Sequence, residues 1–347
     1  MDVRFSEEEL LLRDSVLGQA EKLVPDTVQG LEGYDDRVLW ERLASAGLLA
    51  LGLPEALGGA GNVTDVAIVL QALGRVFAPV PYLGGAVLPG QLLAAAGVPP
   101  ATLAPLVAGE LRVAVGLNPV SFDLSVEGDD GVLAWDAAGA AAALVASRDG
   151  SGRLVAVALQ GPTPGLDLTR QARWCDTGRR VDIGDLGGPV GFDARRRWHA
   201  LALAAVASDM VGVMEGALRL AVDYAAGREQ FGVPIGSFQA IQHLLAEQHV
   251  NLEGARSLTV YAAWALEHRG LDDAALAAHT AKAYCSEVGK QLCEAVSQVH
   301  GGMGMTWECR AQVFLRRMMA DRGFLGDEKA HYREIAMVRK AMVGRGL

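Results

Sequence analysis

The chain lacks the features that would suit it to a highly charged partner or to a membrane. Its 31 basic residues are outnumbered by 41 acidic ones, which gives a formal net charge of -10. A surface for nucleic acid or for an anionic membrane needs a basic patch. No basic leader followed by an apolar run opens the chain, and charged residues recur too often for a membrane span. We therefore expect a cytoplasmic protein that binds neither nucleic acid nor membrane.

Cysteine is also scarce. The four cysteines show no CxxC spacing and no accompanying pair of histidines, so the sequence suggests neither a zinc site nor a disulfide framework. We expect no metal, and we expect these side chains to be buried as small apolar groups. They are Cys175, Cys285, Cys293 and Cys309.

What is present is an ordinary globular composition, with 51% hydrophobic residues in a chain of 347, enough for two or three domains. The first domain, over residues 1–106, is expected to be helical. Ser6 can cap its first helix, and Glu9 completes a capping box. Further helical segments are expected over residues 36–46, 63–77 and 88–96.

Residues 107–195 change to short apolar runs, which predict strands over 111–117, 131–135, 142–147 and 154–159. Turn chemistry separates the runs, for example Gly-Asp-Asp-Gly at residues 128–131. Val113, Val115 and Leu117 alternate with smaller or polar neighbours, a pattern typical of a half-buried antiparallel sheet. We expect a small central antiparallel β domain.

Residues 196–347 return to the helical period. Helices are expected from 196 to 227, 237 to 269, 272 to 300 and 308 to 322, with a last one after Gly326. Long antiparallel helices with short links make a bundle. The predicted fold class is a multi-domain α+β protein: an N-terminal helical domain, the β domain and a C-terminal four-helix-type bundle.

One stretch, REQFGVPIGSFQ at residues 228–239, breaks the helical pattern and restarts it. Gly232 and Pro234 interrupt the helix, and Ser237 is a good N-cap for the next one. This predicts a tight helix–helix corner. Such a corner is either purely structural or a fixed frame that presents Arg228 and Gln239 to a polyanionic ligand.

Three motifs together resemble those of the acyl-CoA dehydrogenase family, and the resemblance covers nearly the whole chain. They are LPEALGGAG at residues 53–61, the stretch at 228–239, and QVHGGMG at 298–304. Their order and spacing are like those of the family. The family resemblance implies an acyl-CoA substrate and FAD bound at a subunit interface, with electron-transfer flavoprotein as electron acceptor.

The resemblance also implies roles for individual residues. Arg228 would pair with the FAD pyrophosphate, because a guanidinium is a forked, permanently charged donor. Phe231 and Ile235 would pack near the adenine, and Gln239 would form a hydrogen bond. Gln298, Gly301 and Gly302 would bring a side-chain amide and backbone amides close to the cofactor. The glycines could equally be a helix terminator.

The family pattern fails at the catalytic base, a carboxylate that takes the α proton of the thioester. The stretch that usually reads Y-E-G-T has Leu325 at the glutamate position, and the alternative position on the first bundle helix has Ala202. Asp209 is the best remaining candidate. Other carboxylates near these positions are Glu215, Asp327 and Glu328, while Glu308 is expected in a first helical turn, where it would favour the dipole.

The strands that line the flavin ring in the family are also not visible in the central domain. Trp135 is either a remnant of one of them or a tryptophan of the sheet core. These losses resemble the short subunit of heteromeric, α2β2 actinobacterial steroid-type acyl-CoA dehydrogenases, whose full-length paralogue would supply the base. The alternatives are a self-sufficient homo-oligomeric dehydrogenase with a displaced carboxylate, a flavin monooxygenase on the same fold, and a non-catalytic scaffold.

Overall fold

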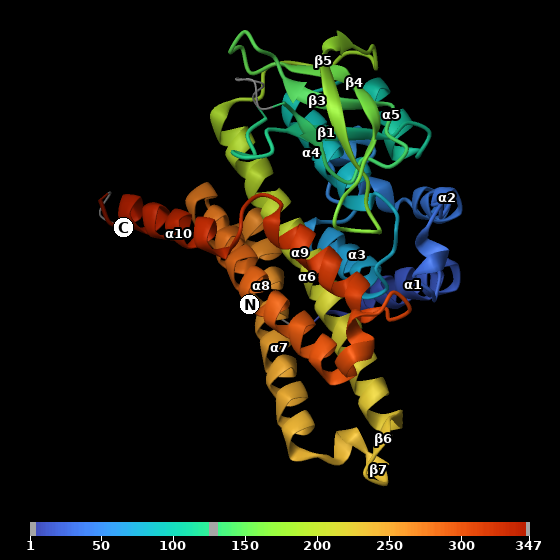
Figure 1. Ribbon diagram of the computed structural model, residues 1–347. Helices are drawn as coiled ribbons and strands as arrows, with labels where there is room; N and C mark the ends of the chain where they lie inside the picture. The colour runs from blue at the N-terminus through green and yellow to red at the C-terminus, as the bar shows by residue number, and fades with distance from the viewer. Residues whose placement is uncertain (1–4, 125–130, 345–347) are drawn as a thin grey trace.

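The computed structural model describes residues 5–124 and 131–344 and shows helices, a small barrel and a second set of helices along the chain (Figure 1). Residues 128–130 of the expected turn at 128–131 lie outside the described residues.

At the first helix, Ser6 accepts a hydrogen bond from the Glu9 amide at 3.2 Å, and Glu9 accepts one from the Ser6 amide at 2.6 Å. The capping box is confirmed. The N-terminal helices are α1 (Glu7–Leu23), α2 (Arg37–Ser45), α3 (Val63–Arg75), α4 (Leu88–Ala96) and α5 (Pro100–Val107).

The central strands close into a barrel in the order β1-β2-β5-β4-β3. The strands are β1 (Val113–Leu117), β2 (Leu133–Ala134), β3 (Ala142–Ala146), β4 (Leu154–Thr163) and β5 (Ala172–Arg180). The sequence did not predict β5. The predicted limits of this domain, 107 and 195, both fall inside helices, since α5 ends at Val107 and α6 begins at Phe192.

The expectation of a half-buried, wholly antiparallel sheet is wrong for β1. Every residue of β1 is buried, and β1 pairs with β3 in parallel, with Val113 opposite Ala142. The reason is that β1 serves two cores. Val113 and Val115 belong to the main core shared with the helices, whereas Ala114 belongs to the interior of the barrel.

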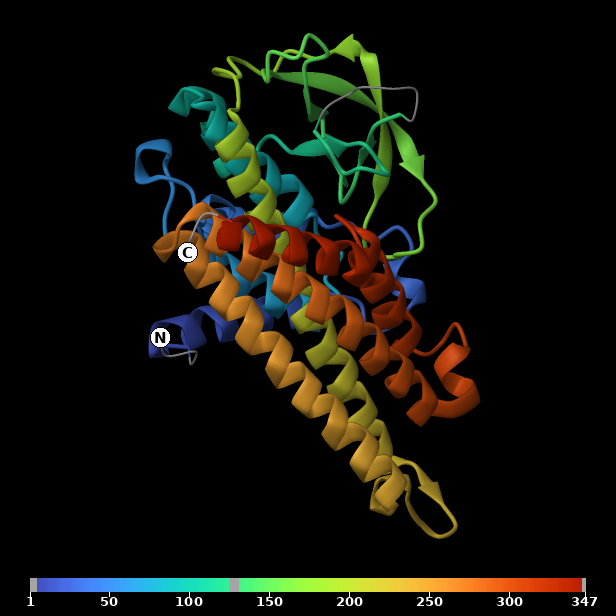
Figure 2. The same cartoon turned by 90° about the vertical axis from the view of Figure 1, so that its left-hand side faces the viewer.

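The described C-terminal residues form five α-helices, with α6 at their centre (Figures 1 and 2). They are α6 (Phe192–Gly227), α7 (Gln239–His268), α8 (Leu271–His300), α9 (Ala311–Gly323) and α10 (Glu328–Gly344). Contrary to the sequence expectation, α6 is long and apolar enough to cross a membrane. However, 94% of its most apolar window is buried, because α3, α7, α8 and α9 pack around it. Its apolar length is that of a core helix.

Helices α3 and α6 cross closely at glycines. A Cβ atom added to Gly212 would lie 2.2 Å from the Gln71 carbonyl oxygen, and one added to Gly216 would lie 2.0 Å from the Arg75 carbonyl oxygen. Backbone atoms cannot move aside without shifting a helix. The absence of a side chain therefore sets the distance between these two helices.

We expect Gly212→Ala to lower the free energy of unfolding by about 1–3 kcal/mol, because overpacking forces the helices apart. The matched control is Gly18→Ala in α1, where an added Cβ meets no atom within 4 Å. That change is expected to stabilise the protein by about 0.5–1 kcal/mol through helix propensity. Urea denaturation measures both, and equal effects of the two substitutions would contradict the close crossing.

Candidate functional site

The stretch at residues 228–239 is a β-hairpin, not the helix–helix corner that the sequence predicted. Strands β6 (Glu229–Gln230) and β7 (Val233–Pro234) pair in antiparallel fashion. Phe231 and Gly232 between them both have positive φ, 55° and 81°, as in the two-residue turns that suit hairpins. Ser237 does not cap α7, since its hydroxyl donates to the Pro234 carbonyl at 2.7 Å and Phe238 is the N-cap residue.

The tip of the hairpin holds an aromatic side chain in solvent. Phe231 is 94% exposed and meets Phe238 edge-on, with 6.2 Å between ring centroids. A bulky residue at positive φ is strained, and such strain is concentrated at ligand and partner contacts. An exposed aromatic in this conformation is suited to packing against another molecule.

Two polar side chains of the hairpin region are open to solvent. Arg228 and Gln239 are exposed, and within the described part of the chain neither side chain forms a hydrogen bond or an ion pair. Ile235 is half-buried behind them. The guanidinium and the amide are therefore available to a ligand that arrives from outside the protomer.

The glycine motif at residues 298–304 follows the end of α8. Gly301 has φ of 61°, a conformation that favours glycine, and it ends the helix. Gly301 and Gly302 are exposed, and an added Cβ at either would meet no atom within 4 Å. Gln298 is also exposed, and no intramolecular partner for its side chain occurs among the described residues. The loop thus ends a helix, with the Gly301 N–H donating to the Gln298 carbonyl, and it leaves the Gln298 side-chain amide open.

A ring stack joins the two motifs. Tyr224, one turn before Arg228 on α6, stacks on His300 at the end of α8, with 4.4 Å between centroids and 23° between planes. Figure 2 shows the hairpin and the α8–α9 connection towards the same end of the bundle. Residues that the sequence separates by about seventy positions are therefore brought to one surface.

This surface fits the phosphate-bearing part of FAD. A permanently charged guanidinium and exposed amides are the donors that a pyrophosphate requires. Glycines without nearby atoms leave room for a close approach of the cofactor to the backbone. Arg228, Gln239 and Gln298 are exposed, so their side chains are open to a ligand from outside the protomer.

Neither family position for the base carries an ionisable group. Leu325 is buried at 4% exposure with φ of 61°, and Ala202 is fully buried on α6. An aliphatic side chain cannot accept the α proton. The structure thus offers no base at the two positions from which the family takes it.

Asp209, the candidate base from the sequence, lies in a buried ion network. Its carboxylate accepts hydrogen bonds from Arg317 at 2.6 and 3.0 Å and pairs with Arg170 at 2.8 Å. Burial alone would raise the pKa of Asp209, but the Arg170 and Arg317 guanidiniums outweigh it and hold the pKa below its usual range. Its oxygens are occupied by structural partners, as expected of a group that holds helices together.

The other nearby carboxylates also have local partners. Glu215 pairs with two arginines at 2.8 and 3.0 Å. Asp327 caps α10 by accepting from the Ala330 amide at 3.0 Å, and Glu328 pairs with Arg322 at 2.6 Å. Glu308 is exposed but precedes α9, so the expected place in a first helical turn is wrong.

Trp135 does not lie in the barrel core. Its ring stacks on Phe324, with 4.1 Å between centroids and 16° between planes, and Arg170 lies 4.3 Å from the ring centroid. These residues line a cavity of about 280 Å³ between the barrel and the bundle. The stack ties the barrel to the α9–α10 linker that carries Leu325.

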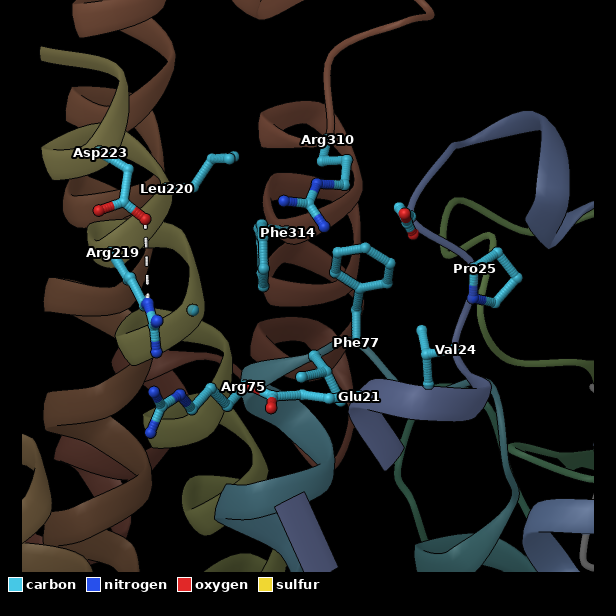
Figure 3. A pocket seen from close by; sticks show the side chains of 13 residues that line it. Glu21, Val24, Pro25, Arg75, Phe77, Arg219, Leu220, Asp223, Arg310 and Phe314 are labelled. Carbon is cyan, nitrogen blue, oxygen red and sulfur yellow. Dashed lines mark ion pairs between the residues drawn. The ribbon is translucent and has the colours of Figure 1, made fainter. Parts of the chain in front are cut away.

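A separate cavity of about 280 Å³ lies between the end of α1 and helices α3, α6 and α9 (Figure 3). None of the motif residues line it. It is lined by three cationic and three anionic side chains, so its lining carries no excess of positive charge. These are Arg75, Arg219, Arg310, Glu21, Asp26 and Asp223.

The chain has a helical domain, a small barrel and a bundle that ends in exposed hydrogen-bond donors suited to phosphate. This combination is typical of a flavin-dependent oxidoreductase. The acyl-CoA dehydrogenase N-terminal and C-terminal domain families match residues 6–99 and 200–339. The acyl-CoA dehydrogenase IpdE2 of Mycolicibacterium smegmatis is 30% identical over 346 residues, covering 95% of this chain and 98% of the relative. The chain belongs to the acyl-CoA dehydrogenase family, whose members are FAD-binding flavoproteins.

Two solved structures share the fold over almost the whole chain. A steroid acyl-CoA dehydrogenase variant, Tcur3481-Tcur3483, has a TM-score of 0.82 and 26% identity over 97% of this chain and 99% of that one. The ChsE4-ChsE5 complex of Mycobacterium tuberculosis has a TM-score of 0.81 and 26% identity over 97% and 98%. The predicted family and fold class are confirmed.

Proposed function

We propose that this chain is the short, FAD-completing subunit of a heteromeric α2β2 acyl-CoA dehydrogenase, and that its full-length partner supplies the base. One contrast carries the proposal. Neither Leu325 nor Ala202 can act as a base, whereas Arg228 and Gln298 are exposed and without partners among the described residues. The chain keeps the exposed side chains proposed to contact FAD on another subunit, and it lacks the carboxylate base that would act on a substrate of its own.

The reaction is the α,β-dehydrogenation of an acyl-CoA thioester. Bound FAD would supply the acceptor for the hydride of the β carbon, and electron-transfer flavoprotein is the proposed electron acceptor. In this chain Arg228 would donate to the pyrophosphate, Phe231 and Ile235 would pack near the adenine, and Gln239 would form a hydrogen bond. Gln298 would supply a side-chain amide, and Gly301 and Gly302 would let the cofactor approach the backbone. A bulky acyl group, steroid or branched, is the proposed substrate, in keeping with the steroid enzyme among the relatives.

Co-expression tests the assembly. The chain is produced alone and with a full-length acyl-CoA dehydrogenase encoded beside it, and the flavin absorbance per protomer is measured after purification. We expect a colourless chain on its own and a yellow complex with the partner. A chain that alone binds one FAD per protomer and oxidises acyl-CoA would refute the proposal, and a colourless protein from every co-expression would favour the scaffold.

The hairpin arginine gives a second prediction. In the assembled complex, Arg228→Ala is expected to weaken FAD binding about tenfold to a hundredfold, because a charge-assisted contact is worth roughly 1.5–3 kcal/mol. The control is Arg219→Ala, an exposed arginine on α6 that pairs with Asp223 at 3.9 Å (Figure 3). Flavin titration of the apo complexes measures both. Unchanged FAD affinity in Arg228→Ala would show that the hairpin has only a structural role.

A further inference from the structure

Six ionisable side chains are buried together where the barrel meets α6 and α9. Two are arginines and four are aspartates, and none is more than 9% exposed. If every carboxyl group were ionised, the two guanidiniums would leave two negative charges uncompensated, and a buried charge without a partner is costly. We call these residues the Asp–Arg cluster: Asp136, Asp167, Arg170, Asp209, Arg317 and Asp321.

Asp209 and Asp321 share one guanidinium. Arg170 lies 2.8 Å from an oxygen of Asp209 and donates a hydrogen bond to Oδ1 of Asp321. Arg317 donates to Asp209 at 2.6 and 3.0 Å, whereas Oδ2 of Asp321 has no hydrogen-bond partner among the described residues. Two carboxylates held on the same cation repel each other, but a hydrogen bond can join them when one of them carries a proton. A proton on Asp321 would therefore remove one negative charge and make that carboxyl group a donor.

The other two aspartates are compensated more weakly. Arg170 lies 3.9 Å from Asp136 and 3.8 Å from Asp167, beyond hydrogen-bonding distance. Asp136 accepts from the Gly84 amide at 2.9 Å, and Asp167 accepts from the Thr169 amide at 2.8 Å. The second oxygen of each carboxyl group has no partner within the described part of the chain. The excess of negative charge thus stays within the cluster.

Two groups on α8 also face Asp321, and neither removes this excess. Lys282 is fully buried, but its Nζ donates to one hydroxyl and two carbonyl oxygens at 2.7 to 3.1 Å and forms no ion pair with any described carboxylate. Cys293 is a buried thiol, and burial raises its pKa, so it is uncharged at neutral pH. A proton is therefore the simplest means of neutralising the cluster.

We propose that the Asp–Arg cluster is a pH-sensitive clamp between the barrel and the helices. At neutral pH Asp321 carries a proton and donates a hydrogen bond to Asp209. Loss of this proton at higher pH leaves two carboxylates on one guanidinium, and their repulsion weakens the attachment of the barrel. The clamp requires neither the flavin nor the partner subunit.

The surroundings give the sign of the pH dependence. Burial is the main cause that raises the pKa of Asp321 well above its usual range, and the Asp209 carboxylate adds to it. Burial likewise raises the pKa of Asp136 to about 6. Both groups bind protons more tightly in the folded than in the unfolded chain. Their contribution to stability is complete below the ordinary aspartate pKa of about 4, and it is lost as the pH rises through the folded values.

Asp321→Asn tests the proton. The asparagine amide can donate to Asp209 while its oxygen accepts from Arg170, so it reproduces a protonated carboxyl group. Urea denaturation of the full chain gives the folding equilibrium constant at each pH from about 5 to 8. We expect the ratio of this constant in the variant to that in the wild type to rise by up to about tenfold per pH unit. A ratio that is constant or falls over this range would overturn the proposal.

The matched control is Asp176→Asn in β5. Asp176 also accepts from a backbone amide, that of Gly178 at 3.2 Å, but it is exposed. The ratio for this variant is expected to stay constant over the same pH range. A rise equal to that of Asp321→Asn would show that the pH dependence does not come from the buried cluster, and would overturn the proposal.

If Asp321→Asn does not fold, the unmodified protein still decides. A protonated carboxyl group has an infrared carbonyl band that ionised carboxylates lack. At pH 7 exposed aspartates and glutamates are ionised, so we expect this band from the folded chain and its loss on thermal unfolding. A folded chain without the band would overturn the proposal, as would a band that is unchanged in a folded Asp321→Asn variant.

Discussion

Arg317→Met is expected to lower the free energy of unfolding by about 3–5 kcal/mol, because it removes one of the two guanidiniums that compensate the buried Asp209 carboxylate. Arg317 is 2% exposed and holds three segments together. It binds Asp209 on α6 and also donates to the Ala78 carbonyl at 3.0 Å and to the Thr169 hydroxyl at 3.1 Å. One side chain thus links the N-terminal domain, the central region and the bundle.

The neighbouring residue provides the control. Arg316 lies on the same helix, is half-buried and donates to Gln312 at 2.7 Å. Arg316→Met is expected to cost less than about 1 kcal/mol, as is usual for partly exposed polar contacts. Urea denaturation of both variants makes the comparison. Similar losses would show that the buried network contributes little.

The network limits the damage in one respect. Arg170 pairs with Asp209 at 2.8 Å and also with Asp321, so Asp209 would keep one cation in Arg317→Met. Burial, together with the nearby Asp209 carboxylate, raises the pKa of Asp321 well above its usual range. A carboxyl group of this cluster can therefore take up a proton when a cation is removed from it. Its protonation would keep the loss in the free energy of unfolding towards the lower end of the range.

The second large effect concerns the base. In the proposed complex, replacing the glutamate at the family's Y-E-G-T position of the full-length subunit by glutamine is expected to lower turnover by roughly 10²–10⁴, the usual contribution of a positioned base. Asp209→Asn in this chain is expected to leave turnover per bound FAD unchanged within about twofold. Its contacts with Arg170 and Arg317 make it a structural group.

Both variants are assayed by acyl-CoA-dependent dye reduction, normalised to flavin content and at a temperature where each complex is folded. This normalisation matters because Asp209→Asn also weakens the buried network. A hundredfold loss in Asp209→Asn with full activity in the partner variant would reverse the assignment. The enzyme would then be self-sufficient, with a displaced carboxylate.

Features set by neighbouring residues were predicted well from the sequence. The capping box at Ser6 and Glu9 needs only residues three apart, and it formed as expected. The hairpin was not predicted. Ser237 is a residue type that favours the N-cap, but its hydroxyl donates to the Pro234 carbonyl instead. Local residue preferences therefore predicted the break between the two helices correctly but predicted its geometry wrongly.

Features set by distant residues left no local signal. Arg170 and Asp321 pair across 151 positions, and Trp135 stacks on Phe324 from another domain. The sequence marked Asp209 as a carboxylate near an empty position, but Arg317 reaches it only when α6 and α9 pack together, and Arg170 reaches it from the segment before β5. The FAD-contacting residues were proposed from motif order, and their roles stay predictions.

The linker at Leu325 has a consequence for how this lineage can change. The shape of the linker is fixed by its neighbours: Gly326 accepts from Lys282 at 2.7 Å and from His331 at 3.1 Å, and Phe324 stacks on Trp135. None of these contacts uses the side chain of Leu325. The backbone would hold whatever residue stands there in the same place, so loss or gain of an acid at this position requires a single replacement and no remodelling of the loop.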